Sequence, residues 1–488
     1  MLELLSSLGR VALHLNCGRH DVVSLKRQPA GLLQHASGNG RRSSGRTVLT
    51  ASCLLAFLLP VQAQPIHFGS ADDPLETSTI SPWRRSGTLQ FMGGLSLIGA
   101  QWRTAGHTSV EIHSSTVSAR AEGTLRAGIY GTYDPDIDDP YDLARLIDYV
   151  RVTPPQSRTY LRAGPSSRFR LGTGHLVNFY NSKTAWDDRT IALEGSTQGR
   201  VAGLEAFSDN FLFDRVVAGR ASVQPLFWAR ESRASSLEIG VSYVADVRQA
   251  GERPLLSAYG LDLRFTAATI GDILVESFTS FSRYRNGGAG LAFGADLSSD
   301  NFVDVARFRV RMALYYSGDG FIPGYFGSFY PVRNPTARIL KSEDLSDTDT
   351  LGAVVGIPLA VAPGGTSLET EVRLLFFRSF EFWYSFRRHF GGEPLSEYHI
   401  RLFFRSSRIT AYVGQDRAGL KSFFTLFNDL GDLTWMEFRT DYHVTAGLWV
   451  FVRAVYSFEE VPSATDDGTQ RFLVQRRFEP FTGFRLGF

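Results

Sequence analysis

Apolar and polar residues alternate one by one through most of the chain after residue 88. In 307–314, for example, arginines at odd positions alternate with apolar residues at even positions. A period of two places the two sets on opposite faces of a β-strand. The same alternation predicts further strands over 117–129, 237–247, 257–267, 289–297, 368–376, 398–405, 436–444 and 482–488.

These strands run about ten residues, a length with which a tilted strand crosses a bilayer, whereas strands of soluble domains are commonest at about five or six residues. Their polar faces carry charges of both signs, which a barrel places in its lumen. We count about 16 strands, with a range of 14 to 18, since bacterial single-chain barrels use even numbers. The pattern predicts an all-β chain with a single closed antiparallel transmembrane β-barrel over residues 88–488.

The segment 41–63 has the three parts of a secretory signal peptide. Arginines at 41, 42 and 46 form its positive end, 48–59 form a short apolar core, and 61–63 supply a cleavage site of the small-residue type. We therefore expect residues 1–63 to be removed as a presequence. A buried helix of a soluble protein is the alternative interpretation of the apolar core.

Cleavage near Gln64 would leave 64–87 as an irregular periplasmic N-terminal segment and would change the composition. Cys17 and Cys53 lie in the presequence, so the mature chain has no cysteine for disulfides or thiolate metal sites. The full chain has a net charge of +2, but the mature chain has 44 basic and 47 acidic residues, a net charge of −3. The basic isoelectric point thus gives no indication of nucleic-acid binding. No run of about 18 apolar residues indicates a conventional transmembrane helix.

The chain ends on an aromatic residue in a strand with one apolar face. Phe484, Leu486 and Phe488 share that face. Together with the signal peptide and the serial alternation, this end resembles the closing strand of bacterial outer-membrane β-barrels of the porin-like kind, over nearly all of the mature chain. The resemblance implies the lipid bilayer of the bacterial outer membrane as location, and it allows a homo-oligomer. It also implies that the assembly machinery recognises Phe484, Leu486 and Phe488.

The best candidate site is a distributed set of charges on the polar faces of the predicted strands. Rings of both charge signs around a wet lumen select solutes by size and charge. The alternative is that the same side chains are salt bridges filling a closed lumen. The residues expected to line the lumen are Arg307, Arg309, Arg311, Glu369, Glu371, Arg373, Arg401, Arg405, Glu437, Arg439, Asp441 and Arg453.

The function expected from this pattern is passive passage of small hydrophilic solutes, with no catalysis, cofactor or metal. One alternative is a structural or assembly component of the outer membrane with a plugged lumen. Another is an outer-membrane hydrolase, for which His175, Asn178 and Ser182 supply the residue types but no diagnostic spacing. We interpret 160–165 and the glycine-rich stretch 171–175 as barrel strands with a bend at the glycines.

Two long interruptions, 131–157 and 317–347, are expected to be extracellular connections, of which some fold inward. Residues 141–150 predict one or two turns of helix. Asp134, Asp136 and Asp138 have the spacing that begins a calcium loop, but the later ligand positions do not fit an EF-hand. A solvated acidic loop is favoured, and loose divalent-cation binding stays open.

Overall fold

The computed structural model describes residues 87–488, apart from 115, 130, 155–158, 230–231, 249–255, 303–304, 335–336, 341–353, 356–361, 378, 391–395, 421–432, 446 and 462–469. The predicted signal peptide, the presequence 1–63 and the segment 64–86 lie outside the described residues. The described part is all-β, and none of its helices is both long enough and apolar enough to cross a membrane.

Within the described residues, twenty strands pair antiparallel, each with the next, in one closed ring. They are β1 (Gly87–Ile98), β2 (Gln101–His113), β3 (Val117–Gly128), β5 (Ile147–Val152), β6 (Tyr160–Gly164), β7 (Ala192–Gln198), β8 (Ala202–Ser208), β9 (Val216–Val223), β10 (Glu238–Asp246), β11 (Leu256–Ile270), β12 (Ile273–Tyr284), β13 (Ala289–Phe302), β14 (Ala306–Ser317), β17 (Gly365–Phe376), β18 (Phe380–Phe390), β19 (Ser396–Arg405), β20 (Ile409–Leu420), β21 (Thr434–Thr445), β22 (Leu448–Val461) and β23 (Gln470–Gly487).

The remaining elements are short and are not part of this ring. A strand outside the ring, β15 (Ala337–Leu340), pairs parallel with β23 and antiparallel with β16. The others are β4 (Gly131–Thr132), β16 (Val354–Val355), η1 (Asp134–Asp136), α4 (Tyr141–Arg145), α5 (Ser232–Ser235) and α6 (Tyr330–Arg333).

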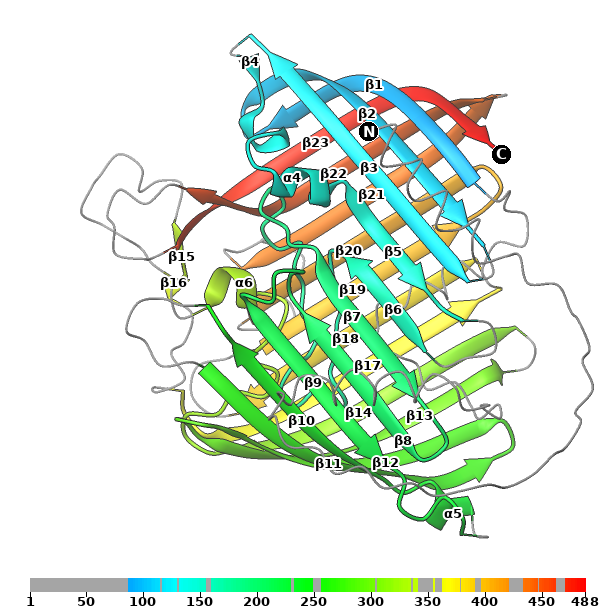
Figure 1. The fold of residues 1–488 in the computed structure, drawn as a ribbon, viewed down its shortest axis with the longest axis vertical. Helices are drawn as coiled ribbons and strands as arrows, with labels where there is room; N and C mark the ends of the chain where they lie inside the picture. Colours follow the sequence, from blue (N-terminus) through cyan, green and yellow to red (C-terminus); the bar gives the residue numbers. More distant parts are fainter. Residues whose placement is uncertain are drawn as a thin grey trace, which may run out of the picture. The chain divides into compact units, whose positions relative to one another are not determined.

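The first and last strands close the barrel. β1 pairs with β23 from Thr88↔Gly487 to Ile98↔Arg477, so the blue and red ends of the sheet lie side by side (Figure 1). At the terminus, Gly87 and Phe488 exchange two backbone hydrogen bonds of 2.9 and 3.0 Å. A closed ring leaves no unpaired strand edge.

The predicted barrel is confirmed, but the predicted number of about 16 strands is wrong. Several strands have weak alternation, which makes the number hard to count from the sequence. β7 and β8 are short and contain glycine, and β18 (FEFWYSFRRHF) has aromatic residues on both faces. The helix expected over 141–150 stops at Arg145, because residues from Ile147 onward pair with β3 as β5.

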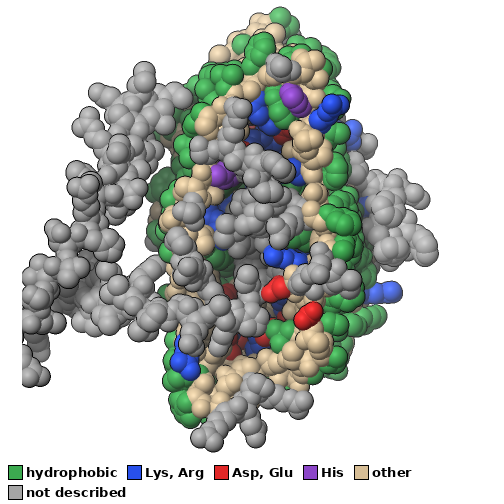
Figure 2. All heavy atoms as spheres, turned by 90° about the vertical axis from the view of Figure 1, so that its right-hand side faces the viewer, with side chains coloured by type: hydrophobic (Ala, Val, Ile, Leu, Met, Phe, Trp, Pro, Cys, Tyr) green, Lys and Arg blue, Asp and Glu red, His purple; other side chains and the backbone are tan. Residues whose placement is uncertain are grey.

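The outside of the barrel is apolar and the inside is charged. On β14 the even-numbered face includes Met312 and Tyr316, which are 52% and 47% exposed, whereas Arg311 and Tyr315 on the odd-numbered face are buried. Figure 2 shows hydrophobic side chains around the outer surface and arginine, acidic and histidine side chains within the rim. This is the arrangement of a strand ring with lipid outside and a polar interior.

The two ends of the barrel differ in the length of their connections. The end that holds Gly87 and Phe488 has mostly short turns, such as 271–272 between β11 and β12 and 406–408 between β19 and β20. The opposite end carries the long connections, including 165–191 and 318–364. Because such barrels have short periplasmic turns and longer extracellular loops, the long-connection end is assigned to the cell exterior.

Two of these long connections fold into the barrel. Residues 165–191 form the first inner segment, and residues 318–334 form the second. Both contribute side chains to one hydrophobic cluster, in which Phe169 and Val177 of the first pack with Phe326 and Tyr330 of the second. The two segments also bridge through the backbone, since the Asn178 N–H donates to the Phe326 carbonyl.

The interpretation of 171–175 as barrel strand is wrong. β6 ends at Gly164, and its partner β7 begins at Ala192, directly opposite. Gly172 and Gly174 have φ of +54° and +78°, a region that favours glycine and breaks an extended strand. The glycines therefore allow the turns with which the first inner segment doubles back inside the barrel.

Candidate functional site

Most residues expected to line the lumen are buried within the barrel. Arg307, Arg309, Arg405 and Arg439 are partly exposed, and the other eight are buried. On β14 and β17 the charged residues occupy the face opposite the exposed apolar residues. The buried ones are Arg311, Glu369, Glu371, Arg373, Arg401, Glu437, Asp441 and Arg453.

One group of these charges joins wall strands to each other. Arg453 of β22 donates to Glu122 of β3 at 3.0 Å and to Glu479 of β23 at 2.9 Å. Arg439 of β21 lies 3.2 Å from the same Glu122. Asp441 accepts a hydrogen bond from Arg485 at 2.7 Å. Buried acids and arginines thus satisfy one another along the inner wall, as buried charges require.

A second group joins the wall to the first inner segment. The guanidinium of Arg170 donates to Glu371 of β17 at 2.6 Å. Arg311 of β14 donates to the Thr173 carbonyl, and Arg401 of β19 donates to the Ser167 carbonyl at 3.1 Å. These predicted residues therefore hold the first inner segment against the wall, and the sequence pattern did not predict that this segment lies inside the barrel.

The other predicted residues are distributed less tightly. Arg309 pairs with Asp296 on β13 at 3.1 Å, and Arg373 pairs with Glu381 on β18 at 2.9 Å. In the part of the chain that the structure describes, the side chains of Arg307 and Glu437 form no hydrogen bond or ion pair. The predicted set is thus spread along the interior and does not converge on one point.

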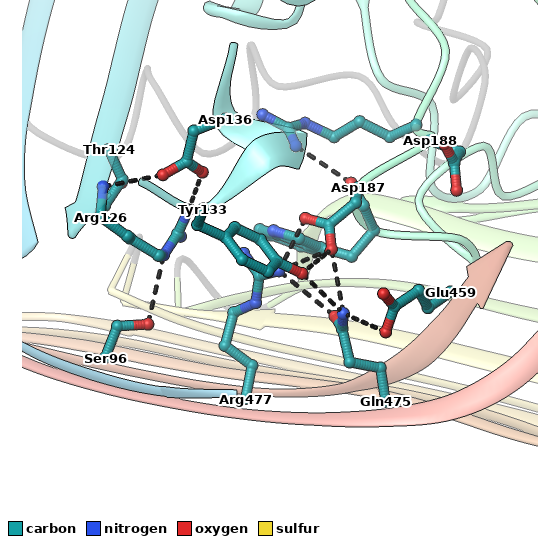
Figure 3. A network of polar contacts seen from close by, with 12 residues as sticks. Ser96, Thr124, Arg126, Tyr133, Asp136, Asp187, Asp188, Glu459, Gln475 and Arg477 are labelled. Carbon is teal, nitrogen blue, oxygen red and sulfur yellow. Dashed lines mark hydrogen bonds and ion pairs between the residues drawn. The ribbon is translucent and has the colours of Figure 1, made fainter. Parts of the chain in front are cut away.

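The sequence list missed the densest polar network, which Figure 3 shows. Asp187, near the end of the first inner segment, accepts hydrogen bonds from Arg477 at 2.6 and 2.8 Å, from Gln475 at 3.0 Å and from the Tyr133 hydroxyl at 2.8 Å. These partners come from β23 and from the connection after β4. Arg477 and Gln475 occupy the charged face of the alternating terminal strand, so the pattern could have indicated them.

Arg126 of β3 forms the other half of this network. It pairs with Asp136, and it donates to Glu479 of β23 at 2.6 Å and to Ser96 of β1 at 3.2 Å. Asp136 is therefore part of a buried ion pair, and in this it differs from the other two acidic residues of the stretch, Asp134 and Asp138. Among the described residues, no group of three or more His, Cys, Asp or Glu side chains could hold a metal ion.

The three residues considered for hydrolysis have separate partners. His175 Nδ1 lies 2.9 Å from the Ser280 hydroxyl, Asn178 bonds to Arg170 and Glu369, and Ser182 bonds to backbone groups. His175 is outside the strands, and burial lowers the pKa of its imidazole to about 3, so it is neutral. Within the described residues these three side chains form no Ser–His–Asn relay.

No protein-family model matches the chain, and no curated protein matches its sequence. Among solved structures, the chain is similar to Wzi, a carbohydrate-binding outer-membrane β-barrel involved in group 1 capsule assembly in Escherichia coli. That match has 10% identity, a TM-score of 0.32, and coverage of 84% of this chain and 86% of the other.

Two further matches are OccD3 of Pseudomonas aeruginosa and the siderophore receptor PiuA of Acinetobacter baumannii. OccD3 has 8% identity and a TM-score of 0.29, covering 88% of this chain and 95% of its own. PiuA has 8% identity and a TM-score of 0.32, covering 83% and 82%. Such low TM-scores carry no argument about function. The closed ring, with its apolar exterior and charged interior, makes the chain a bacterial outer-membrane β-barrel protein.

Proposed function

We propose that this protein is a porin-like channel through which small hydrophilic solutes pass the outer membrane passively. The observation that carries the proposal is the inner wall of a ring of twenty strands, which carries charges of both signs. Barrels of about 16 to 18 strands already enclose an aqueous channel unless loops or domains fill them. A wall of this kind would interact with a solute through both charge signs and would select by size and charge.

The inner segments set the width of the proposed path. Both are fixed to the wall by buried polar contacts, such as Arg170 with Glu371 of β17 and the Tyr330 hydroxyl with Asp246 of β10, at 2.6 Å each. Such constriction favours small solutes over large ones. In this proposal the partly exposed Arg309 faces the narrowed part, and the buried Arg311, Glu369 and Glu371 beside it contribute to its transverse field.

A plugged barrel with a structural or assembly role is the second candidate. It is favoured by the burial of most of the first inner segment, including Arg168, Arg170 and Asp187. If these contacts never break, the same charged side chains only hold the first inner segment in place, and no solute passes.

Liposome swelling separates the two functions. The mature barrel is reconstituted and diluted into isotonic solutions of uncharged sugars of increasing size. The channel proposal expects swelling with the smallest sugars and a steep fall with size. No swelling with any solute, from a barrel shown to be folded by heat-modified migration, would refute it and favour the plugged barrel.

A further inference from the structure

A cavity of about 60 Å³ opens beside the second inner segment, at the end assigned to the cell exterior. Its wall combines that segment with Ser367 near the start of β17, His389 near the end of β18 and Glu397 near the start of β19. One water needs about 10–15 Å³ on this measure. The enclosed space therefore accommodates a carboxylate group and a few further atoms, and a ring attached to that group would lie in the open mouth of the cavity.

The cavity contains an arginine whose side chain has no hydrogen bond, although the Glu397 carboxylate attracts it. In the part of the chain that the structure describes, Arg333 forms no hydrogen bond or ion pair, and its Nε atom is buried. Buried guanidinium groups normally bond to carboxylates or carbonyls, because an unsatisfied buried donor is costly. An anion bound from outside would satisfy it.

A second arginine presents an unused donor to the same cavity. Arg387 of β18 is 8% exposed, and its Nη2 donates to Glu397 at 2.7 Å. Its Nη1 is buried and has no hydrogen bond, and it lies 4.0 Å from the Glu369 carboxylate, at the limit of an ion pair. A Cβ at Gly324, where φ is +59°, would lie 2.7 Å from this Nη1, so the glycine leaves room for the guanidinium to face the cavity.

The charge and shape of the wall limit the ligand. Among the lining side chains, Arg333 and Arg387 face one carboxylate, that of Glu397, so the lining has an excess of positive charge. Glu369 lies behind the lining, 4.0 Å from Arg387, and is shared with Arg170 at 3.7 Å. The second inner segment adds the rings of Phe321, Tyr325, Phe329 and Tyr330. Tyr325 and Tyr330 pack edge to face, with centroids 5.5 Å apart, which holds the aromatic side in place before any ligand arrives.

We propose that this mouth cavity binds a small organic carboxylate with a ring, its carboxylate on the guanidinium groups of Arg333 and Arg387 and its ring on the aromatic side. Guanidinium groups match carboxylate geometry in this way. This site deepens the proposed function, because it would be the point where a permeating anion first binds. Only that role rests on the proposed function, and the binding itself does not.

Fluorine NMR with the full mature barrel in detergent tests the site. The probes are 4-fluorobenzoate and its neutral isostere 4-fluorobenzamide, and the readout is protein-dependent broadening of the fluorine line. The wild type should bind the benzoate and not the amide. Arg333→Gln should weaken benzoate binding about tenfold, as loss of a charge-assisted hydrogen bond in a dry site does.

The matched control is Arg388→Gln, which removes the same charge from the exposed neighbour of Arg387 on β18 and should leave binding unchanged. If Arg333→Gln does not fold, Arg333→Lys decides, because it keeps the charge without the planar donors and should bind more weakly than the wild type. Equal broadening by benzoate and amide, or equal affinity in the wild type and the folded Arg333 variant, would overturn the site. Binding by a barrel that fails the swelling test would refute the channel alone, and swelling without binding would refute the site alone.

Discussion

Replacing Asp187 by asparagine should release the end of the first inner segment from the barrel wall. The carboxylate accepts two hydrogen bonds from Arg477, whose side chain is 1% exposed, and others from Gln475 and Tyr133. A neutral amide cannot balance the buried guanidinium. Breaking one partner of a buried ion pair costs about 3–5 kcal/mol. We expect a loss of that size in the free energy of unfolding.

The assay is urea-dependent unfolding of the barrel in lipid, with linear extrapolation of the free energy. Asp188→Asn is the matched control, since the Asp188 side chain is 39% exposed and 3.9 Å from Arg145. Exposed pairs of this kind contribute about 0–1 kcal/mol. Asp187→Asn combined with Arg477→Met should recover part of the loss, because no charge is then left buried and unpaired. Equal small losses for Asp187→Asn and Asp188→Asn would refute the reasoning.

Two further predictions concern the barrel wall and its closure. A water-soluble thiol reagent should label Arg309→Cys and not Val310→Cys in a chain of residues 64–488, which contains no other cysteine, because the odd face of β14 should point inward; the reverse pattern would disprove the register. Phe488→Ala should refold in detergent yet reach the outer membrane poorly in cells, because the Phe488 side chain is 60% exposed while its backbone still pairs with Gly87. Refolding yield and the amount of heat-modifiable barrel in outer-membrane fractions measure this, and normal membrane levels would show that Phe488 is not a targeting element.

The alternation was sufficient to predict the barrel, because period two is a local property of each strand. It did not predict the number of strands. In β18, aromatic residues occupy the inner face too, and Trp383 is fully buried, where its indole N–H donates to Glu371 at 2.7 Å. Where a segment fills the lumen, the wall strands can carry apolar residues on their inner face. The alternation of apolar and polar residues is then no longer visible in the sequence of that strand.

The position of the first inner segment could not be predicted from the alternation of residues, for a related reason. Its residues bond to partners hundreds of positions away, such as Arg170 to Glu371 and Asp187 to Arg477. Nothing in the local sequence specifies such pairs, although the glycines at 172 and 174 mark the turns. The cavity donors were also hidden, since Arg333 and Arg387 come together only when the connection after β14 folds back against β18.

Single-channel conductance in planar bilayers tests the central claim that a polar path remains beside the inner segments. The informative comparison is the wild type with a variant in which a short Gly-Ser turn replaces 165–191, which the geometry permits because Gly164 and Ala192 are opposite each other in the β6–β7 pair. The account predicts small ohmic steps from the wild type and larger ones from the variant. A silent wild type beside a conducting variant would contradict the account and show that the first inner segment closes the lumen.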